Sequence, residues 1–325
     1  MHASADITER FLAGDKAAVA RGISWAENAD QRFAAFLAKV YSRVGRAWRI
    51  GVTGPPGAGK STLVNELAKS LRARSRTVGI LAVDPSSPYS GGALLGDRIR
   101  MEERTLDAGV YIRSMASRGS HGGLSRATVD ACDVMDAFGF DEIVVETVGV
   151  GQAEYDIVSA ADTVLVVLCP GAGDGVQAMK AGLLEVADVI AVNKADLPGA
   201  DRMIVDLEEA MHVRLAGRSS WVTPVVACSA ARSDGIEEVL GAIEKHREHA
   251  KARGLAGIRR EKRLEQVHRV LQERLAEHLW GRGGYGERAR ALLDSGRSPY
   301  DVVAELFSAL LAEAKPTNNG AQRKP

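Results

Sequence analysis

The sequence predicts an α/β protein whose core is a mostly parallel sheet, with helical segments at both ends of the chain. Short apolar runs alternate with helical stretches between residues 48 and 250. The runs are almost continuously apolar, which is typical of strands covered on both faces. Regular alternation of strands and helices predicts crossover connections and therefore a parallel sheet. Residues 1–47 have helical periodicity, and strand-like runs are missing over residues 251–314.

Seven strands are expected in the central region. Each is short, and most are followed by a pattern long enough for a helix that carries the chain back across the sheet. In chain order the expected strands are Trp48–Thr53, Val78–Val83, Val110–Arg113, Glu142–Glu146, Thr163–Cys169, Val189–Val192 and Val222–Ala227.

Helices are expected on both sides of this region. Residues 1–47 form a helical N-terminal extension whose apolar stripes should pack on the central domain. Residues 251–325 form a helical arm with further helices over Glu287–Leu293 and Pro299–Ala314, followed by a polar tail that we expect to be disordered. Spacings of three and four define one stripe on the first helix of the arm, made of Leu264, Val267, Leu271, Leu275 and Leu279.

Composition narrows the classes of function. The chain has 42 Lys plus Arg and 42 Asp plus Glu, so it lacks the basic excess of a typical nucleic-acid-binding protein. No stretch approaches the ~18 apolar residues of a membrane span, and the N-terminus lacks a signal-peptide pattern. Cys132, Cys169 and Cys228 have no metal-ligand spacing and are expected to be buried, reduced thiols. We expect a cytoplasmic protein with no nucleic-acid or membrane partner.

A phosphate-binding loop follows the first expected strand. Residues 54–61 match the pattern of a glycine-rich turn followed by Lys and Ser, and a helical pattern begins directly afterwards. The glycines let successive backbone N–H groups point at phosphate, Lys60 supplies a positive charge, and the Ser61 hydroxyl should ligate Mg²⁺. The strand before the motif and the helix after it argue against an accidental turn. The nucleotide-binding residues expected here are Gly54, Pro55, Pro56, Gly57, Ala58, Gly59, Lys60, Ser61 and Thr62.

Another segment indicates which base is bound. Asn193-Lys194-Ala195-Asp196 follows an expected strand, and the Asp196 carboxylate can accept hydrogen bonds from guanine N1–H and N2–H₂, a donor pair that adenine lacks. Asn193 should brace the pocket, and the Lys194 stem should lie over the ring. The next strand ends in a segment like the loop whose backbone meets guanine O6, with Ser229, Ala230 and Ala231 as expected contacts. These motifs predict a protein that binds GTP and GDP.

Three acidic residues are candidates for holding the metal ion. Asp84 and Glu146 end adjacent expected strands, and Asp97 lies in a glycine-rich segment between them. Carboxylates at the carboxyl ends of parallel strands point into the crevice beside the phosphate loop, where they can hold Mg²⁺ directly or through water. An ordinary strand-end carboxylate remains the alternative for each. Together with Ser61 they form the expected metal set. The expected catalytic set is Lys60, Asp84, Asp97 and Glu146.

Other polar residues carry weaker signals. Gly149 would give the close backbone approach that senses a γ-phosphate, and Gln152 is a weak candidate for positioning water. His121 is a loop histidine for which no role is the simpler interpretation. His246 and His249 lie one helical turn apart without further ligands, so no metal site is expected there. Candidates for stabilising charge are Arg98, Arg100 and Arg118.

Several of these segments together resemble the MeaB/ArgK family of GTPases. The resemblance rests on Val83–Pro88, Gly91–Arg98 and Glu146–Gln152, supported by Arg118-Gly119 and Gly122–Ser125, and it covers roughly residues 45–315. It implies a SIMIBI-type P-loop GTPase domain and a C-terminal arm that joins two chains into a homodimer. It also implies a chaperone for adenosylcobalamin-dependent methylmalonyl-CoA mutase, which gates cofactor loading and protects the mutase from inactivation.

The resemblance assigns roles to the same residues. Lys60 and Ser61 become phosphate and Mg²⁺ contacts, Asp84, Asp97 and Glu146 become metal-site and switch residues, and Asn193, Lys194 and Asp196 become the base reader. The loop at residues 170–180 becomes an additional switch. The domains expected are a helical extension at 1–47, a P-loop GTPase domain at 48–250, and a dimerisation arm with its tail at 251–325.

Two other functions stay open. The same family carries an older assignment as a kinase of arginine/ornithine transport, which would phosphorylate a protein acceptor from ATP; Asp196 argues against ATP. A GTPase that inserts nickel or cobalt is a related class, and it would need Cys and His ligands near the switches. Cys132 and His121 do not form such a cluster in the sequence.

Overall fold

A parallel sheet of seven strands organises the first of two compact units, Met1–Arg259; the second unit is Arg260–Pro325. The computed structural model describes residues 6–85, 107–117, 123–147, 153–171, 182–215 and 220–313. All neighbouring strands are parallel, in the order β3-β2-β4-β1-β5-β6-β7. The strands are β1 (Trp48–Thr53), β2 (Val78–Pro85), β3 (Val110–Ser117), β4 (Glu142–Thr147), β5 (Thr163–Leu168), β6 (Val189–Val192) and β7 (Val225–Ala227).

The α/β fold with a parallel sheet is confirmed, and all seven expected strands are present. β1 and β6 have the predicted ends, and the other five differ at one end. β3 continues to Ser117 rather than Arg113, because it pairs with β2 along its whole length. β7 begins at Val225 rather than Val222. Pro224, directly before it, has no N–H to donate to a strand ladder, which explains the late start. The domain limits expected at residues 47 and 250 remain predictions.

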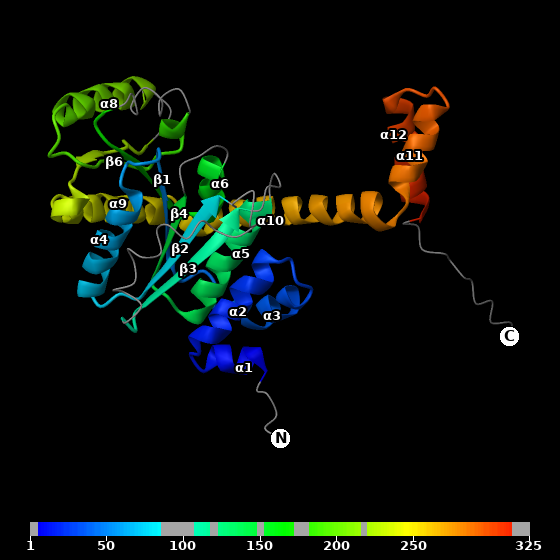
Figure 1. Ribbon diagram of the computed structural model, residues 1–325, viewed down its shortest axis with the longest axis horizontal. Helices are drawn as coiled ribbons and strands as arrows, with labels where there is room; N and C mark the ends of the chain where they lie inside the picture. Colours follow the sequence, from blue (N-terminus) through cyan, green and yellow to red (C-terminus); the bar gives the residue numbers. More distant parts are fainter. Residues whose placement is uncertain are drawn as a thin grey trace. The chain divides into compact units, whose positions relative to one another are not determined.

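Helices cover both faces of the sheet (Figure 1). Because successive strand side chains point to opposite faces, Ile50 and Val52 of β1 pack with α4 and α9, whereas Ile143 and Val145 of β4 pack with α5 and α6. No helix in the described ranges is long and apolar enough to cross a membrane. The helices of this unit are α1 (Ile7–Leu12), α2 (Lys16–Glu27), α3 (Arg32–Val40), α4 (Lys60–Ala73), α5 (Gly123–Phe138), α6 (Ala153–Ala160), α8 (Ala200–Leu215) and α9 (Ile236–Ala252), with 3₁₀ turns η1 (Tyr41–Arg43), η3 (Leu183–Glu185) and η4 (Ala230–Arg232).

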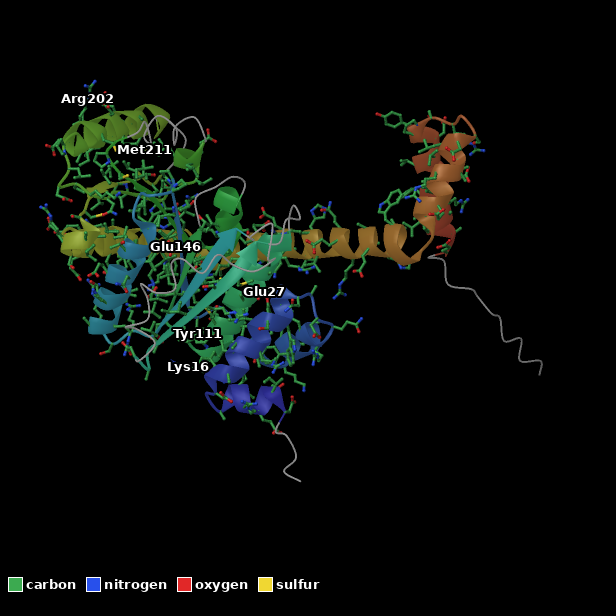
Figure 2. All side chains as sticks on the ribbon, in the orientation of Figure 1. Lys16, Glu27, Tyr111, Glu146, Arg202 and Met211 are labelled. Atoms are coloured by element: carbon green, nitrogen blue, oxygen red, sulfur yellow. The ribbon has the colours of Figure 1, made fainter. Side chains whose placement is uncertain are left out.

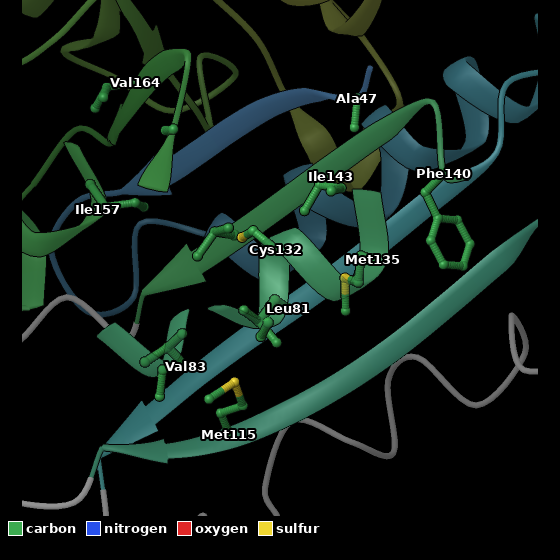
Figure 3. Packing of buried hydrophobic residues seen from close by; sticks show 14 of the residues in the cluster. Ala47, Leu81, Val83, Met115, Cys132, Met135, Phe140, Ile143, Ile157 and Val164 are labelled. Carbon is green, nitrogen blue, oxygen red and sulfur yellow. The ribbon is translucent and has the colours of Figure 1, made fainter. Parts of the chain in front are cut away.

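The N-terminal helices pack on the core through α5, as the sequence predicts. Met115 and Leu81 from the sheet meet Cys132 and Met135 from α5 in the larger core cluster (Figure 3). On the outer side of α5, the Phe11 ring of α1 makes edge-to-face contacts with aromatic rings of α3 and α5, at centroid distances of 5.2 and 5.3 Å. The extension is therefore part of the first unit and shares its core.

A buried ion cluster holds the chain segment that leads into β1. The Arg49 guanidinium donates to Asp133 at 2.7 Å and to Asp136 at 2.9 Å, and all three side chains are buried. Asp136 also accepts backbone N–H groups from residues 45–47 at 2.8–3.0 Å. Buried charges are tolerated when they are paired and hydrogen-bonded in this way. The cluster joins α5 to the segment that leads from the extension into the sheet.

A second arginine holds the beginning of α10 (Leu255–Ala276) against the same segment. Arg259 donates to the Asp162 carboxylate at 2.6 Å and to the carbonyl oxygens of Gly45 and Ala47 at 2.6 and 2.7 Å. Its guanidinium also lies 5.9 Å from the centre of the Trp48 ring, and that of Arg247 lies 5.1 Å from it. The start of α10 is thus fastened to the first strand of the sheet.

The second unit is helical, as expected. It contains most of α10, the π-helical turn η5 (Glu277–Arg282), α11 (Tyr285–Asp294) and α12 (Pro299–Glu313). Tyr285 and Ala289 of α11 pack with Val302 and Leu306 of α12 in a small core of its own. A second face of α12 is exposed and apolar; its large side chains are Tyr300, Val303, Phe307 and Leu311.

The apolar stripe expected along α10 is exposed, except at its last residue. Leu264, Val267, Leu271 and Leu275 are 42–62% exposed. Leu279 instead packs against the small core of the second unit, which corrects the five-residue stripe that the sequence predicts. The reason is geometric: α10 ends at Ala276, and the wider turn of η5 moves Leu279 out of the spacing of an α-helix.

We expect Asp136→Ala to lower the free energy of unfolding by about 3–5 kcal/mol, because it breaks a buried ion pair and leaves three backbone N–H groups without their acceptor. Urea unfolding followed by circular dichroism measures the change. The control is Asp206→Ala, whose carboxylate meets Arg202 at 4.0 Å on the surface of α8 and should contribute less than about 1 kcal/mol. Equal effects of the two substitutions would contradict the structural role of the cluster.

Candidate nucleotide-binding site

The loop between β1 and α4 is built so that only glycine fits at both of its ends. Gly54 has φ +139°, and a β-carbon there would lie 2.0 Å from the carbonyl oxygen of Val167 on β5. Gly59 has φ +88°, and a β-carbon there would lie 2.3 Å from Nδ2 of Asn193. Side chains other than hydrogen are excluded by this combination of backbone angle and space. The predicted phosphate loop therefore lies directly against the segment predicted to read the base.

Lys60 begins α4 and folds back over the loop. Its Nζ donates to the carbonyl oxygens of Gly54 at 2.8 Å and Pro55 at 2.9 Å, and the side chain is buried. An ammonium group binds an anionic phosphate oxygen more strongly than a neutral carbonyl. The same side chain can therefore turn from the loop carbonyls to a bound phosphate without leaving the site.

The residues that follow Lys60 and end β4 form an oxygen-rich pair. Ser61 Oγ donates to Glu146 Oε1 at 2.5 Å, and Glu146 is buried at the end of β4 (Figure 2). Thr147 Oγ1 donates to Thr53 Oγ1 at 3.0 Å, which ties the end of β4 to the end of β1. Hydroxyl and carboxylate oxygens are the ligands that Mg²⁺ prefers. Two of the four predicted metal residues thus lie within contact of each other.

The other predicted metal and switch residues are less fully described. The backbone of Asp84 follows Val83, which pairs with Thr147, so it lies beside the end of β4. Asp97 and Gly149 lie outside the residues that the structure describes, as do 172–180 of the additional switch loop. The same holds for Gln152, His121, Arg98, Arg100 and Arg118.

Asn193 joins the phosphate loop to the base-reading segment. Its Nδ2 donates to the carbonyl oxygen of Ala58 at 2.8 Å, and its Oδ1 accepts from the backbone N–H of Ala230 at 2.9 Å. Lys194, at φ +58°, adds a hydrogen bond from Nζ to the carbonyl oxygen of Gly57 at 2.7 Å. Ala230 is one of the residues expected to contact guanine. In this structure its backbone N–H donates to Asn193. The two predicted motifs form one hydrogen-bonded site.

The Asp196 carboxylate is held from two sides. Its Oδ1 accepts from Ser229 Oγ at 2.7 Å, and its Oδ2 lies 3.1 Å from the Arg232 guanidinium. The Ser229 hydrogen bond, with a smaller effect of the Arg232 charge, holds the pKa of Asp196 below its ordinary value. Arg232 is not among the residues that the sequence predicts for this site. Arg232 lies three residues after Ser229 in a short turn, and this spacing is the sequence feature from which its place beside Asp196 could be predicted.

His246 and the three cysteines are buried in the first unit. His246 is buried, with Nδ1 2.9 Å from Thr163 Oγ1 and Nε2 3.3 Å from Asp188 Oδ1. Across the described ranges, no group of three His, Cys, Asp or Glu side chains is arranged to hold a metal ion. The three cysteines are buried thiols outside any disulfide, as predicted.

The chain is similar to known proteins in its family pattern, its sequence and its fold. The family model described as "Methylmalonyl Co-A mutase-associated GTPase MeaB" matches residues 19–283. A protein of Pyrococcus abyssi that is named as a GTPase is 43% identical over 312 residues, 94% of this chain and 96% of that protein. The mouse protein "Methylmalonic aciduria type A homolog, mitochondrial" is 35% identical over 236 residues, 71% of this chain and 57% of that protein. The crystal structure of a "LAO/AO transport system kinase" matches with a TM-score of 0.71 and 27% identity, covering 94% of this chain and 96% of that one.

We expect Cys228, beside the base-reading segment, to be unreactive in the folded protein. Burial, with the nearby Asp234 carboxylate, raises the pKa of Cys228 to about 12. Because the thiolate is the reactive form, alkylation at pH 8 should be far slower than for a free thiol, and its rate should keep rising by about tenfold per pH unit above pH 8 instead of levelling off near pH 9. Iodoacetamide labelling followed by mass spectrometry measures this, with the urea-unfolded protein as control. Rapid labelling of native Cys228 at pH 8 would contradict the buried thiol.

Proposed function

Because the chain belongs to the MeaB family of GTPases, we propose that it is a nucleotide-switched chaperone of an adenosylcobalamin-dependent methylmalonyl-CoA mutase. In this proposal it gates loading of the cofactor and protects the mutase from inactivation. The observation that carries the proposal is the family match over residues 19–283, whose description names the mutase. The mouse relative supports it, since its name refers to methylmalonic aciduria.

The nucleotide is GTP or GDP, and we infer that it binds where the phosphate and base segments meet. Lys60 and the backbone of the glycine-rich loop would hold the phosphates, and Asp196 would accept the two guanine donors. The contacts of Asn193 with Ala58 and Ala230 support this, because they fix the distance between the two segments before a ligand arrives. A site arranged in advance loses less entropy on binding.

Mg²⁺ fits the oxygen pair at the end of β4. Ser61 and Glu146 would hold it, with Asp84 and Asp97 as further candidates from the sequence. The observation that supports the fit is the contact of the Ser61 hydroxyl with the Glu146 carboxylate. When bound, the ion neutralises negative charge on the β- and γ-phosphates.

The reaction is transfer of the γ-phosphoryl group of GTP to water, for which positioning and charge neutralisation are the main contributions. Lys60 would move from the carbonyl oxygens of Gly54 and Pro55 to the phosphate oxygens. The Thr53–Thr147 hydrogen bond would keep Glu146 at the correct end of the sheet. Gly149, which is predicted to sense the γ-phosphate, follows Glu146 and Thr147 by two residues, so nucleotide contacts at β4 would reach it along the chain.

The exposed apolar stripe of α10 supports a homodimer. Leu264, Val267, Leu271 and Leu275 lie on one face and are about half exposed. Burying them would contribute on the order of 3–6 kcal/mol per chain before the cost of association. A two-fold contact would bury the same face of both chains. We therefore propose that a second copy of this chain covers the stripe.

Replacing the base-reading carboxylate should change the nucleotide preference. Asp196→Asn presents a donor where guanine also has donors, so GDP affinity should fall by about tenfold or more and xanthosine diphosphate affinity should rise, since xanthine carries an acceptor at position 2. Isothermal titration calorimetry with GDP, ADP and xanthosine diphosphate measures this. Equal affinities of the unmodified protein for GDP and ADP would show that Asp196 does not read the base.

Substitutions in the exposed apolar stripe of α10 test the proposed dimer. Leu271→Asp combined with Leu275→Asp should give a monomer that still binds GDP, because the nucleotide segments lie in residues 54–231. Val205→Asp is the control, since Val205 is an exposed valine on α8 outside the stripe. Light scattering gives the mass. An unmodified protein that is monomeric at micromolar concentration would refute the dimer, and a double variant that unfolds would favour packing within one chain.

The chaperone role is tested with the purified mutase. We expect a complex whose affinity differs between GDP and a non-hydrolysable GTP analogue, measured by biolayer interferometry. Lys60→Ala is the matched variant: it should lose GTP hydrolysis, at a cost of about 3 kcal/mol or more in transition-state stabilisation, yet remain folded. Absence of a complex in every nucleotide state would contradict the proposal. Transfer of γ-phosphate from ATP to a transport protein would favour the kinase function instead.

A further inference from the structure

We propose that Arg232 is a positioning residue that broadens base selection to inosine nucleotides. It keeps Oδ2 of Asp196 paired, so the loss of the guanine 2-amino group weakens binding less than it would in a site without this arginine. The proposal rests on the proposed role of Asp196 as the base reader. It concerns a residue that the family resemblance and the sequence motifs do not assign.

The turn η4 brings two groups to one carboxylate. Ser229 caps this turn, and the N–H of Arg232 donates to the Ser229 carbonyl oxygen at 2.9 Å. In a 3₁₀ turn, side chains three residues apart lie on the same side. Ser229 Oγ therefore reaches Oδ1 of Asp196 at 2.7 Å, while the Arg232 guanidinium reaches Oδ2 at 3.1 Å.

The loop that carries Arg232 is fixed on both sides. Ser229 and Asp234 exchange backbone hydrogen bonds at 2.9 and 3.1 Å, which closes the loop. Ser233, at φ +56°, donates from Oγ to Oε2 of the buried Glu66 on α4 at 2.9 Å. Although the Arg232 side chain is 67% exposed, its backbone is therefore held in place against both the base-reading segment and the phosphate-loop helix.

Arg232 changes which partners the Asp196 carboxylate keeps when the bound base changes. An ionised carboxylate has about four lone-pair positions. Ser229 donates a hydrogen bond to Oδ1, whereas Arg232 stands beside Oδ2 as an ion-pair partner at 3.1 Å. Guanine can donate to this carboxylate through N1–H and the 2-amino group. Hypoxanthine, the base of inosine, has N1–H but no 2-amino group, so one oxygen loses its ligand donor.

A buried acceptor that loses its donor is costly, and this cost is how polar sites reject analogues. A bound base covers the carboxylate and removes water as a replacement partner. Here the Arg232 guanidinium stays beside Oδ2, so the negative charge of the carboxylate keeps a partner when the 2-amino group is missing. The penalty for inosine is therefore reduced, and the arginine acts on the relative affinity of the two bases rather than on nucleotide binding in general.

The test is the ratio of the IDP dissociation constant to the GDP dissociation constant, measured by calorimetry on the full chain. We expect Arg232→Ala to raise this ratio by about threefold or more, the size expected for a partly exposed ion pair. Arg232→Gln is a second variant that should raise it in the same direction. A general loss of structure would weaken both nucleotides and leave the ratio unchanged, so the ratio separates positioning from folding.

Arg202→Ala is the matched control, because its guanidinium projects from α8 into solvent and is 90% exposed (Figure 2). It should leave the ratio at the value of the unmodified protein. An unchanged or lower ratio in both Arg232 variants, with GDP still preferred over ADP, overturns the inference and leaves Asp196 as the base reader. No preference for GDP over ADP in the unmodified protein overturns the base reader, and this inference with it.

Discussion

One buried carboxamide connects the two halves of the candidate site. Asn193 donates to the carbonyl oxygen of Ala58 in the phosphate loop and accepts from Ala230 in the base-reading turn. A parallel sheet brings these segments to the same edge, but strand order alone does not fix their separation. The Asn193 hydrogen bonds do, and Gly59 must lack a β-carbon because this side chain occupies the space. The glycine pattern of the loop and the asparagine of the base motif are therefore parts of one packing constraint.

The features predictable from sequence are those with local causes. Continuous apolar runs located all seven strands, and the phosphate loop was recognisable because its residue types are required by its backbone angles. Contacts that depend on tertiary placement were not predictable. The role of Arg232 requires the turn at Ala230–Arg232 to lie against Asp196, and the position of Leu279 requires the π-helical turn after Ala276. Exposed charges and apolar stripes carry no pattern that identifies their partners.

Different kinds of interaction hold the two ends of the sheet in the first unit. At the carboxyl end, neutral hydrogen bonds such as Thr147 to Thr53 keep the site together and can be exchanged for contacts with a ligand. At the amino end, the Arg49–Asp136 cluster is buried and has no such substitute. Charge pairs excluded from water are costly to separate, whereas hydroxyl pairs rearrange readily. Conformational change is therefore favoured at the end of the sheet that carries the nucleotide segments.

The contacts of Trp48 have a spectroscopic consequence. Its indole is buried and lies 5.1 and 5.9 Å from the guanidinium groups of Arg247 and Arg259, and Arg259 belongs to the first turns of α10. Two nearby cations perturb the excited state of an indole, so the emission of Trp48 depends on whether α10 remains fastened to the sheet. Trp280, in the second unit, is 61% exposed and should emit at longer wavelength. The emission of Trp48 is therefore an optical probe of the contact between the first turns of α10 and the sheet.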